Sequence, residues 1–275
     1  MEELRNRDGL TEKEFLAQYR PGDYERPSVT ADILIFSPSA DLESLKILLI
    51  KRGNHPYMNC WALPGGFVGI TESAFTAACR ELKEETGLTG VYMEQLYTFT
   101  KPERDPRMRV IDIAYMALIN EADVYAGDDA ADAAWFTFSF EEDRMVLENR
   151  DRHVRIEYSL KPKSFTNGII TYENYIPAAE SGAELAFDHA EIIMEGYLRL
   201  RNKVEYTDIA FNLVPEEFAL PDIQRIYELI LGKEVYKKSF RDKMEAVTVD
   251  TGKKGKSVTG GKLSKLFRYE GKRKL

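Results

Sequence analysis

The sequence predicts an α/β (α+β) protein built from two unequal domains, and three observations carry this prediction. Segments rich in β-branched and aromatic residues precede and follow one long acidic helix in the first three quarters of the chain. At 275 residues the chain exceeds the usual size of a single domain. Its C-terminal end has the pattern of two short helices followed by a basic, turn-rich segment. We therefore expect one domain over residues 1–204 and a second over residues 205–275.

Strand and helix signals follow one another along the first domain. Thr11, with Glu14 three residues later, predicts a short helix that begins with a capping box. Apolar and β-branched runs then predict strands over residues 29–36, 45–53, 91–100, 109–119 and near Trp135. Several strands around one long helix are what a sheet covered by helices requires.

The end of the first domain has two further signals. Residues 153–160 alternate between apolar and polar side chains, and with residues 168–176 they predict a hairpin inserted before the next helix. That helix is expected to begin at Asp188, with Glu191 as its capping partner, and to end near Val204. We expect this helix to close the first domain.

Composition excludes several classes of protein. The chain has no run of about 18 apolar residues and no apolar N-terminal targeting segment, so we expect a cytoplasmic protein that does not cross a membrane. The two cysteines, Cys60 and Cys79, lack the CxxC spacing of a metal site and are expected to be reduced thiols. Of the three histidines only His55 lies near the acidic helix, so a zinc site is not expected.

Charge is divided unevenly along the chain. From Lys233 to Leu275 there are fourteen Lys or Arg residues and five acidic residues, a net charge of +9. The preceding chain holds the other 24 basic and 41 acidic residues, a net charge of −17. An acidic body with a basic end favours a polyanionic partner, and duplex DNA is the partner that we expect.

One helical segment is unusually acidic. Thr71 is the expected N-cap and Gly87 the expected terminator, and the residues between them have good helix propensity and no proline. Glu81, Glu84 and Glu85 are related by i+3 and i+4 spacing, so they are expected to project from one face. Like charges at that spacing repel each other unless a cation neutralises them. A hard divalent ion with oxygen ligands does so, and magnesium fits best, with manganese as the alternative.

The other face of this helix and the loop before it complete the pattern. Phe75, Ala78 and Leu82 share a face suited to the core. Gly65 and Gly66 allow the chain to fold tightly against the start of the helix. A backbone carbonyl or amide of this loop can then reach the ion or a phosphate.

The same segment resembles the signature box of the Nudix hydrolases. The box is Gly, five residues, Glu, seven residues, and then Arg-Glu-apolar-x-Glu-Glu-x-Gly-apolar. This chain matches all nine fixed positions, which are Gly66, Glu72, Arg80, Glu81, Leu82, Glu84, Glu85, Gly87 and Leu88. The alternative, a solvated charged helix face, does not explain both glycines and the spacing of the arginine. The resemblance implies a Nudix α/β/α sandwich with a mixed β-sheet.

The resemblance also implies roles for these residues. Nudix hydrolases use a water and divalent metal ions to cleave a diphosphate that joins a nucleoside to another group. Glu81 and Glu85 would be the principal metal ligands, and Glu84 would ligate the ion or orient the other two. Arg80 would hold the glutamates in register, and Glu72 would brace the loop against the helix. The catalytic and metal-binding candidates are thus Glu81, Glu84, Glu85, Arg80 and, through its backbone, Gly65.

The resemblance leaves the general base open and gives a substrate class. The base is either a glutamate of the box or a carboxylate from a distant loop, for which the candidates are Glu103, Glu141 and Glu142. Residues 51–69 and 185–193 resemble the branch that acts on ADP-ribose and its regulator relatives. We therefore expect an ADP-ribose-like nucleoside diphosphate as substrate or effector. The side chains expected to meet its phosphates or its adenine are Arg52, Arg109, Tyr57, Tyr97 and Phe99. His189, by contrast, is expected to start a helix rather than to catalyse.

The C-terminal segment predicts a helix-turn-helix followed by a wing. Pro221 opens a first helix that Gly232 closes. A second helix carries basic residues, while Phe240 and Met244 anchor its other side. Glycine-punctuated turns and an apolar strand then form a β-wing, so we expect a winged helix-turn-helix domain. The residues expected to meet DNA are Lys237, Lys238, Ser239, Arg241, Lys243, Lys254 and Lys256.

This combination resembles the Nudix-related transcriptional regulators of NAD metabolism, in which a Nudix domain precedes a winged helix and ADP-ribose-type ligands act as effectors. Two hypotheses follow. The first is a metal-dependent diphosphatase that converts ADP-ribose to AMP and ribose 5-phosphate, and it ranks first because the box is complete. The second is a DNA-binding regulator of NAD or sugar metabolism whose Nudix domain senses such a ligand. Both kinds of relative imply a homodimer. The alternative for the basic end is a solvated packing or dimerisation module.

Overall fold

The computed structural model describes residues 4–20, 22, 25–120, 133–141, 143–180, 184–261 and 263–271, so the candidate base Glu142 lies outside it. The helices are α1 (Glu12–Gln18), α2 (Ala74–Thr86), α3 (His189–Tyr206), α4 (Leu220–Leu231) and α5 (Lys237–Glu245), with a 3-10 turn η3 (Ile209–Leu213). The strands are β1 (Ser28–Pro38), β2 (Leu45–Lys51), β3 (Trp61–Ala62), β4 (Gly65–Phe67), β5 (Tyr92–Phe99), β6 (Val110–Leu118), β7 (Ala133–Glu141), β8 (Arg144–Asn149), β9 (Val154–Asn167), β10 (Ile170–Ala179), β11 (Phe218–Ala219), β12 (Thr248–Lys256) and β13 (Leu263–Tyr269). Within the described residues, no helix combines the length and the apolar character needed to span a membrane.

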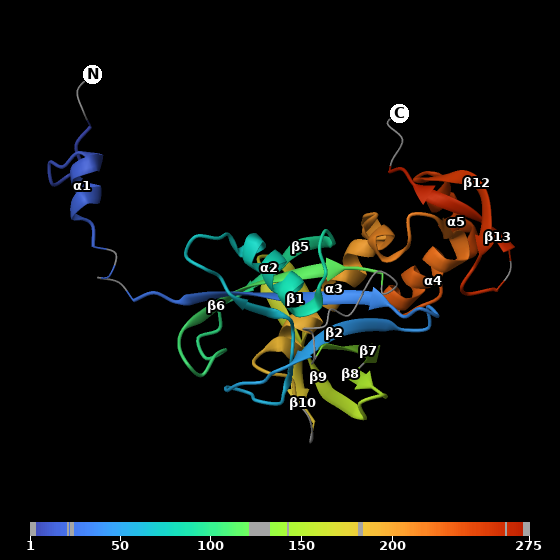
Figure 1. The fold of residues 1–275 in the computed structure, drawn as a ribbon, viewed down its shortest axis with the longest axis horizontal. Helices are drawn as coiled ribbons and strands as arrows, with labels where there is room; N and C mark the ends of the chain where they lie inside the picture. Colours follow the sequence, from blue (N-terminus) through green and yellow to red (C-terminus); the bar gives the residue numbers. More distant parts are fainter. Residues whose placement is uncertain are drawn as a thin grey trace.

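A mixed sheet forms the body of the protein (Figure 1). Its strands lie in the order β10-β9-β8-β7-β2-β1-β6-β5, with β3 beside β2 and β4 beside β1. β1 and β6 run parallel, whereas the other neighbouring strands are antiparallel. The predicted hairpin is confirmed as β9 and β10, and it extends the sheet beyond β8. The predicted fold class with a mixed sheet is therefore confirmed.

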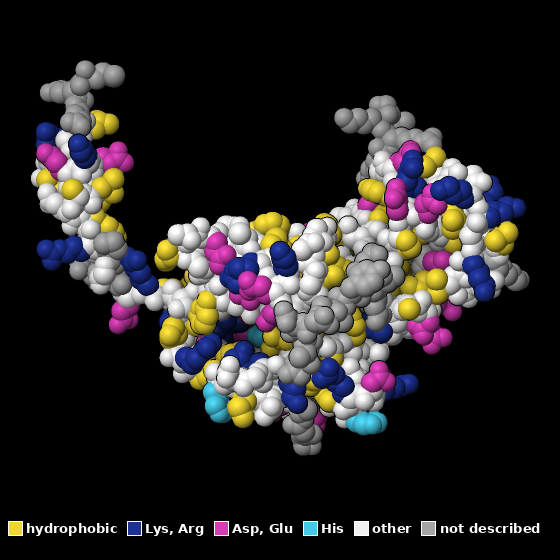
Figure 2. All heavy atoms as spheres, viewed as in Figure 1, with side chains coloured by type: hydrophobic (Ala, Val, Ile, Leu, Met, Phe, Trp, Pro, Cys, Tyr) yellow, Lys and Arg dark blue, Asp and Glu magenta, His cyan; other side chains and the backbone are white. Residues whose placement is uncertain are grey.

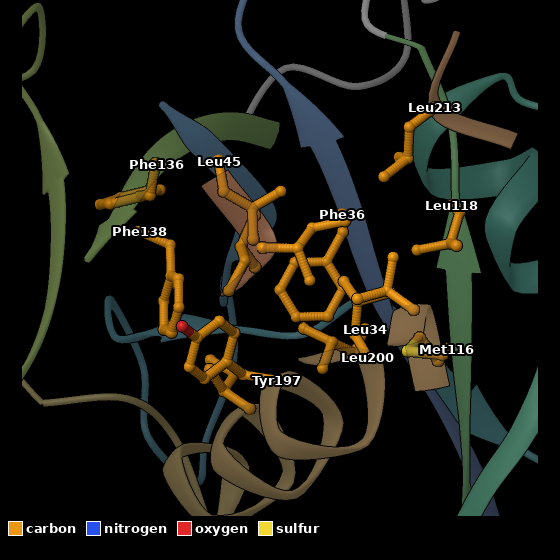
Figure 3. Packing of buried hydrophobic residues seen from close by; sticks show 14 of the residues in the cluster. Leu34, Phe36, Leu45, Met116, Leu118, Phe136, Phe138, Tyr197, Leu200 and Leu213 are labelled. Atoms are coloured by element: carbon orange, nitrogen blue, oxygen red, sulfur yellow. The ribbon is translucent and has the colours of Figure 1, made fainter. Parts of the chain in front are cut away.

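Helices cover both faces of this sheet because side chains alternate along β1. Ile33 belongs to the apolar cluster that includes Leu82 of α2. Leu34 belongs to the cluster on the other face, where Figure 3 shows it next to Leu200 of α3. α3 lies so close to β1 that a Cβ at Gly196 would be 2.1 Å from the Leu34 side chain. The α/β/α sandwich is confirmed, and this glycine permits its close packing.

The acidic helix α2 begins later than predicted. Its N-cap is Ser73, whose side chain accepts a backbone hydrogen bond, so the prediction of Thr71 is wrong by two residues. The carboxylate of Glu72 accepts a backbone hydrogen bond and closes a turn just before the helix. Gly87 ends the helix with a φ of 72°, as predicted. Phe75, which was expected to join the core, is 51% exposed, and its ring contacts only the edge of the core at Tyr115, with 6.0 Å between the centroids.

α1 and α3 differ at their starts. Thr11 and Glu14 exchange the hydrogen bonds of a capping box, as predicted. α1 stands apart from the sheet in Figure 1, and none of its residues is buried. α3 begins after Asp188, as predicted, but this carboxylate makes no capping hydrogen bond. It binds Arg104 instead, and the expected capping partner Glu191 forms an ion pair outside the helix.

The C-terminal lobe is a winged helix, as predicted. β11, β13 and β12 form an antiparallel sheet beside α4 and α5. α4 has a proline in its first turn and ends at Gly232, where φ is 66°. Ile226 of α4 and Phe240 of α5 belong to the same apolar cluster as Leu34 of β1. The expected domain boundary at residues 204 and 205 falls in the last turn of α3, so a continuous helix and a continuous core cross it.

Candidate functional site

A cavity with a volume of about 370 Å³ opens beside the acidic helix. Its wall comes from β1, the end of β2, β4, α2, the loop after β5 and the start of α3. The charged side chains of this wall are Asp32, Lys51, Arg52, Glu85, Arg104, Asp105 and Arg107. Cavities of this size hold small-molecule ligands, and convergent polar groups give such cavities their specificity. This cavity is therefore the candidate ligand site.

Arg80 organises the glutamates of α2. Its guanidinium lies 2.9 Å from Glu72, 2.7 Å from Glu81 and 3.1 Å from Glu84. Glu72 also accepts a hydrogen bond of 2.7 Å from the backbone N–H of Gly69, which ties the loop to the helix. In the part of the chain that the structure describes, no three carboxylate, His or Cys side chains gather as a metal cluster. The expected convergence of the three carboxylates is therefore not seen, since the guanidinium draws two of them to itself.

Glu85 is the carboxylate of the box that faces the cavity. It accepts a hydrogen bond of 2.9 Å from the backbone N–H of Gly65. Burial, together with the nearby charges of Glu81, Asp32 and Glu84, raises the pKa of Glu85 to about 8. A carboxylate with so high a pKa has no neighbouring positive charge that stabilises its ionised form. A divalent cation that prefers oxygen ligands would supply that charge. The carboxylates of Glu81, Glu84 and Glu85 are hard oxygen donors, so their chemistry fits Mg²⁺ or Mn²⁺, but Glu81 and Glu84 are paired with Arg80 here rather than gathered around Glu85.

Gly65 and Gly66 bring the backbone close to these carboxylates. A Cβ at Gly65 would lie 2.5 Å from the backbone oxygen of Ala31. A Cβ at Gly66 would lie 2.2 Å from Oε1 of Glu81. Neither position has space for a side chain, which is the physical reason for the two glycines of the loop.

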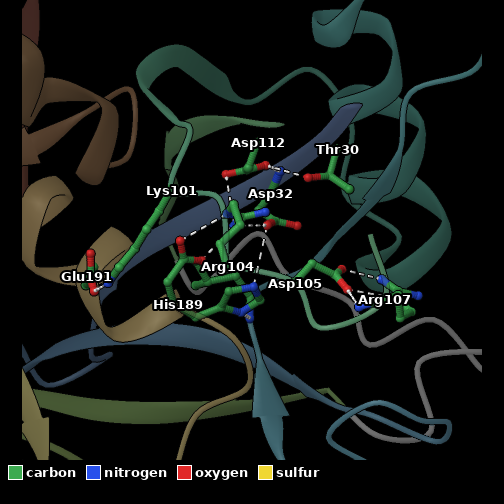
Figure 4. Close-up of polar contacts among 11 residues, drawn as sticks. Thr30, Asp32, Lys101, Arg104, Asp105, Arg107, Asp112, His189 and Glu191 are labelled. Carbon is green, nitrogen blue, oxygen red and sulfur yellow. Dashed lines mark hydrogen bonds and ion pairs between the residues drawn. The ribbon is translucent and has the colours of Figure 1, made fainter. Parts of the chain in front are cut away.

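A buried ionic network forms the inner wall of the cavity (Figure 4). Arg104 donates two hydrogen bonds to Asp188, of 2.7 and 3.0 Å. The same guanidinium lies 3.6 Å from Asp32 and 3.8 Å from Asp112. His189 accepts a backbone hydrogen bond at Nδ1, and its Nε2 lies 3.5 Å from Asp32. One guanidinium and one imidazole thus hold three carboxylates at the site.

This network was not predicted from the sequence, although His189 starts a helix, as expected. Burial raises the pKa of Asp112 well above its usual range, and the neighbouring charge of Asp32 acts in the same direction. The available signal was the presence of these two aspartates inside otherwise apolar strands, β1 and β6, which are parallel neighbours. A buried charge is seldom kept in a strand without a partner.

Arg52 and Arg107 form a positive pair beside the ring of Phe187. Their guanidinium carbons lie 4.8 and 5.9 Å from the centre of that ring. Burial and the charge of Arg107 lower the pKa of Arg52. Tyr57 contacts the same ring, with 4.7 Å between the centroids. Of the predicted substrate residues, Arg52 therefore lies in the cavity wall and Tyr57 at its margin, and two cations so close together favour an anionic ligand.

The remaining predicted residues of the substrate site lie elsewhere. Arg109 is exposed and does not line the cavity, and its expected place is taken by Arg107 in the same loop. Phe99 lines a separate groove between β5, the β9–β10 hairpin and α3. The candidate bases Glu103 and Glu141 are also absent from the cavity wall. Their separation from the cavity depends on how loops and strands are arranged in space, which residue type alone does not reveal.

The side chains of the C-terminal lobe that were expected to meet DNA divide into two groups. Figure 2 shows Lys and Arg side chains along the outer edge of this lobe. The exposed members of the predicted set are Lys237, Lys238, Ser239, Arg241, Lys254 and Lys256. Lys243, by contrast, is half-buried and donates hydrogen bonds to the backbone oxygens of Val204 and Glu205. The assignment of Lys243 to DNA is thus corrected, because its ammonium group binds α3.

Asp222, in the first turn of α4, holds the turn of the wing. Its buried carboxylate accepts hydrogen bonds from the Ser257 hydroxyl at 2.7 Å and from the backbone N–H groups of Val258 and Thr259, each at 3.2 Å. The turn between β12 and β13 therefore has a defined position relative to α4. The sequence pattern gives no sign of this role for Asp222, because an acidic residue in a first helical turn is usually explained by the helix dipole alone.

Two family profiles match the chain in the order of its two lobes. The profile described as NUDIX domain matches residues 26–154. The profile described as NrtR DNA-binding winged helix domain matches residues 210–269. The acidic helix α2 thus falls in the first matched region and the basic helix α5 in the second.

One known protein resembles the chain over nearly its whole length, and another resembles it over about half. The ADPR responsive transcriptional repressor NtrR of Acinetobacter baylyi is 34% identical over 262 residues, which cover 94% of this chain and 88% of the relative. The ADP-ribose pyrophosphatase of Methanocaldococcus jannaschii is 41% identical over 127 residues, or 46% of this chain and 70% of the relative.

Solved structures agree with these relatives. A MutT/nudix family protein from Enterococcus faecalis has a TM-score of 0.75 and 31% identity, with 95% of this chain and 94% of that chain covered. Shewanella oneidensis NrtR complexed with a 27mer DNA has a TM-score of 0.66 and 27% identity, with 88% and 93% covered. The chain therefore belongs to the family of proteins in which a Nudix domain is joined to an NrtR-type winged helix domain.

Proposed function

We propose that the protein is a DNA-binding transcriptional regulator whose Nudix cavity binds ADP-ribose or a related nucleoside diphosphate. One observation carries this proposal. Lys237, Lys238 and Arg241 are exposed on a winged helix, and this lobe shares its apolar core with the domain that holds the cavity. Likeness to an ADPR-responsive repressor over 94% of the chain supports it. The sequence alone ranked hydrolysis first, and these two observations give regulation at least equal weight.

The cavity suits a diphosphate with an attached base. Each planar guanidinium of Arg52 and Arg107 offers paired donors to phosphate oxygens, and Arg52, the half-buried member of the pair, gains most from an anion. The rings of Phe67 and Phe187 line the same cavity and can stack against a base or a ribose. These features favour the ligand class that the segments around the box suggested.

The exposed basic side chains suit the backbone of duplex DNA. α5 would enter the major groove, and Lys254 and Lys256 of the wing would meet phosphates. We also propose a homodimer, because two copies would place two α5 helices on half-sites separated by whole helical turns. The packing-module alternative requires these side chains to be covered by protein instead.

A second candidate activity is hydrolysis of the same diphosphate, and the complete box favours it. Glu81, Glu84, Glu85 and the Gly65 carbonyl would hold a divalent ion, which would neutralise phosphate charge and lower the pKa of the attacking water. Arg80 keeps the glutamates in position through the ion pairs described above. Water would add to one phosphorus and the bridging P–O bond would break, so that ADP-ribose and water give AMP and ribose 5-phosphate.

Two assays on the purified full chain test these functions. The first measures binding to genomic DNA fragments at low salt, including the region upstream of its own gene, with and without ADP-ribose. The second measures turnover of a panel of nucleoside diphosphate derivatives with Mg²⁺. Failure to bind any fragment would overturn the regulator proposal. No turnover of any member by folded protein would rule out the hydrolase as a second activity.

A further inference from the structure

The N-terminal end of α3 is part of the cavity wall. His189, the first residue of the helix, is buried and lies with Nε2 3.5 Å from Asp32. Asp188, directly before it, accepts both hydrogen bonds from Arg104 (Figure 4). A ligand that contacts Asp32, Arg104 or His189 therefore acts directly on the start of α3.

The C-terminal end of α3 is bound by α5. Nζ of Lys243 donates hydrogen bonds of 3.3 and 3.4 Å to the backbone oxygens of Val204 and Glu205. The last carbonyls of a helix lack partners within the helix and carry the negative end of its dipole, so a lysine is well suited to this position. The same Nζ lies 4.7 Å from the centre of the Tyr227 ring of α4. Lys243 therefore joins the basic helix to α3 and α4 rather than to solvent.

Between its two ends, α3 is closely packed. Its 18 residues give a rod about 27 Å long. Tyr197 contacts the rings of Phe138 and Phe140, at 4.9 and 5.0 Å between centroids. Leu200, which Figure 3 shows among the core side chains, and Val204 are fully buried in the core that both lobes share. A close-packed helix of this kind moves as a unit rather than by bending.

We propose that α3 transmits the occupancy of the cavity to α5, and that Lys243 is the positioning residue that joins the two helices. This inference rests on the proposed ligand-responsive DNA binding and names how the two sites are coupled. Ligand contact with the inner wall displaces the start of α3, and the carbonyls of Val204 and Glu205 carry Lys243 and α5 with them. The direction in which α5 presents its exposed side chains then differs between free and liganded protein, which is a coupling free energy between two sites.

Lys243→Met tests this path, because methionine keeps an unbranched apolar stem but cannot donate to the two carbonyls. Lys238→Met is the matched control, since it removes an exposed lysine from the same helix. Both changes are made in full-length protein that carries Glu85→Gln, so that ADP-ribose is not consumed. DNA affinity is then measured with and without saturating ADP-ribose.

The two variants should lose different properties, one the response to ADP-ribose and the other the affinity for DNA. Lys243→Met should keep ligand-free DNA affinity within about threefold, while the effect of ADP-ribose falls from the roughly 5- to 150-fold range of allosteric coupling to less than about twofold. Lys238→Met should weaken DNA binding and leave the effect of ADP-ribose unchanged. Lys243→Arg, which keeps the charge and the donors, should retain the response. A full response in folded Lys243→Met protein would overturn the proposal.

A second measurement does not need DNA. Hydrogen exchange of the α5 amides, residues 237–245, should change when ADP-ribose binds the Glu85→Gln protein. That change should disappear with Lys243→Met, while the amides around the cavity still respond. If the cavity amides respond and α5 does not, even with Lys243 present, the path through α3 is wrong. Absence of DNA binding by every protein would count against the proposed regulator, and hydrogen exchange would still decide the path.

Discussion

The acidic helix α2 and the basic helix α5 hold their charges in opposite ways. In α2 the carboxylates are fixed by the guanidinium of Arg80 and, for Glu85, by a backbone N–H. In α5 Lys238 and Arg241 extend into solvent and form no ion pair with any residue that the structure describes. A site that places an ion against a diphosphate needs fixed ligands, whereas contacts to DNA phosphates need long, solvated cations. A motif with fixed spacing therefore predicts how side chains lie relative to one another, whereas a charge pattern predicts only that a surface is acidic or basic.

The largest effect is expected from Glu85→Gln. The amide keeps the shape of the side chain but removes the charge that faces the cavity, so hydrolysis of ADP-ribose should fall by about 100-fold or more. Initial rates of AMP release with Mg²⁺ measure this, and the melting temperature serves as the control for folding. If the variant kept most of its activity at low Mg²⁺, Glu85 would not be a metal ligand.

Gly66→Ala tests whether the acidic site depends on fixed positions. Its new Cβ would collide with the Glu81 carboxylate, at 2.2 Å in the present geometry. A displacement of about 1 Å at a catalytic group can cost 10²-fold in rate, so we expect a loss between about tenfold and 100-fold. Gly53→Ala is the control in the same cavity wall, because its Cβ would have no neighbour within 4 Å. Equal rates for the two variants would show that Glu81 can move without loss.

A double substitution, Lys238→Ala with Arg241→Ala, tests the basic helix in the same way. DNA affinity should fall about tenfold at low salt, with no effect on hydrolysis. The dependence of log K on log salt should become shallower by about 1.8 per protomer, at about 0.9 for each phosphate that the variant no longer neutralises. An unchanged slope would place these side chains away from the phosphates and would favour the packing-module alternative.

Asp222→Ala should have the smallest effect on function. It leaves the Ser257 hydroxyl and two backbone N–H groups of the wing turn without their buried acceptor, which should cost about 1–3 kcal/mol of stability. DNA affinity should fall only a few-fold, because the basic residues remain. Asp250→Ala, which removes an exposed carboxylate of the same lobe, should change stability less. Denaturant unfolding of both variants measures the difference, and equal destabilisation would mean that the wing turn does not depend on Asp222.

The fold was predictable where local pattern and tertiary structure agree. The apolar, β-branched run of β1 and the Gly87 terminator were visible because each depends on residues close in sequence. The strand β8 was missed, because its six residues are flanked by charges and gain their strand character from β7 and β9. The start of α2 was misplaced because the turn around Glu72 competes with the helix.

The residues of the candidate site show the same contrast between local pattern and tertiary structure. The resemblance to the Nudix box implied that Arg80 holds the glutamates, and its ion pairs agree with this. Arg104, by contrast, meets three carboxylates from distant segments. Lys243 precedes the buried Met244 and lies three residues after the buried Phe240, so its helical position already placed it near the core face. Which partner it meets there depends on α3, and no local pattern contains that information.

The apolar core that runs from the sheet through α3 into α4 and α5 also bears on how this protein can change over time. A cut between residues 204 and 205 would break the last turn of α3 and expose Leu200 and Val204 on one fragment and Ile226 and Phe240 on the other. The winged helix is therefore not a transplantable module, and the chain should melt in a single transition that a cavity ligand raises for both lobes at once. Recombination can exchange domains joined by a loose linker, but here the lobe that holds the cavity and the winged helix should be inherited, folded and lost together.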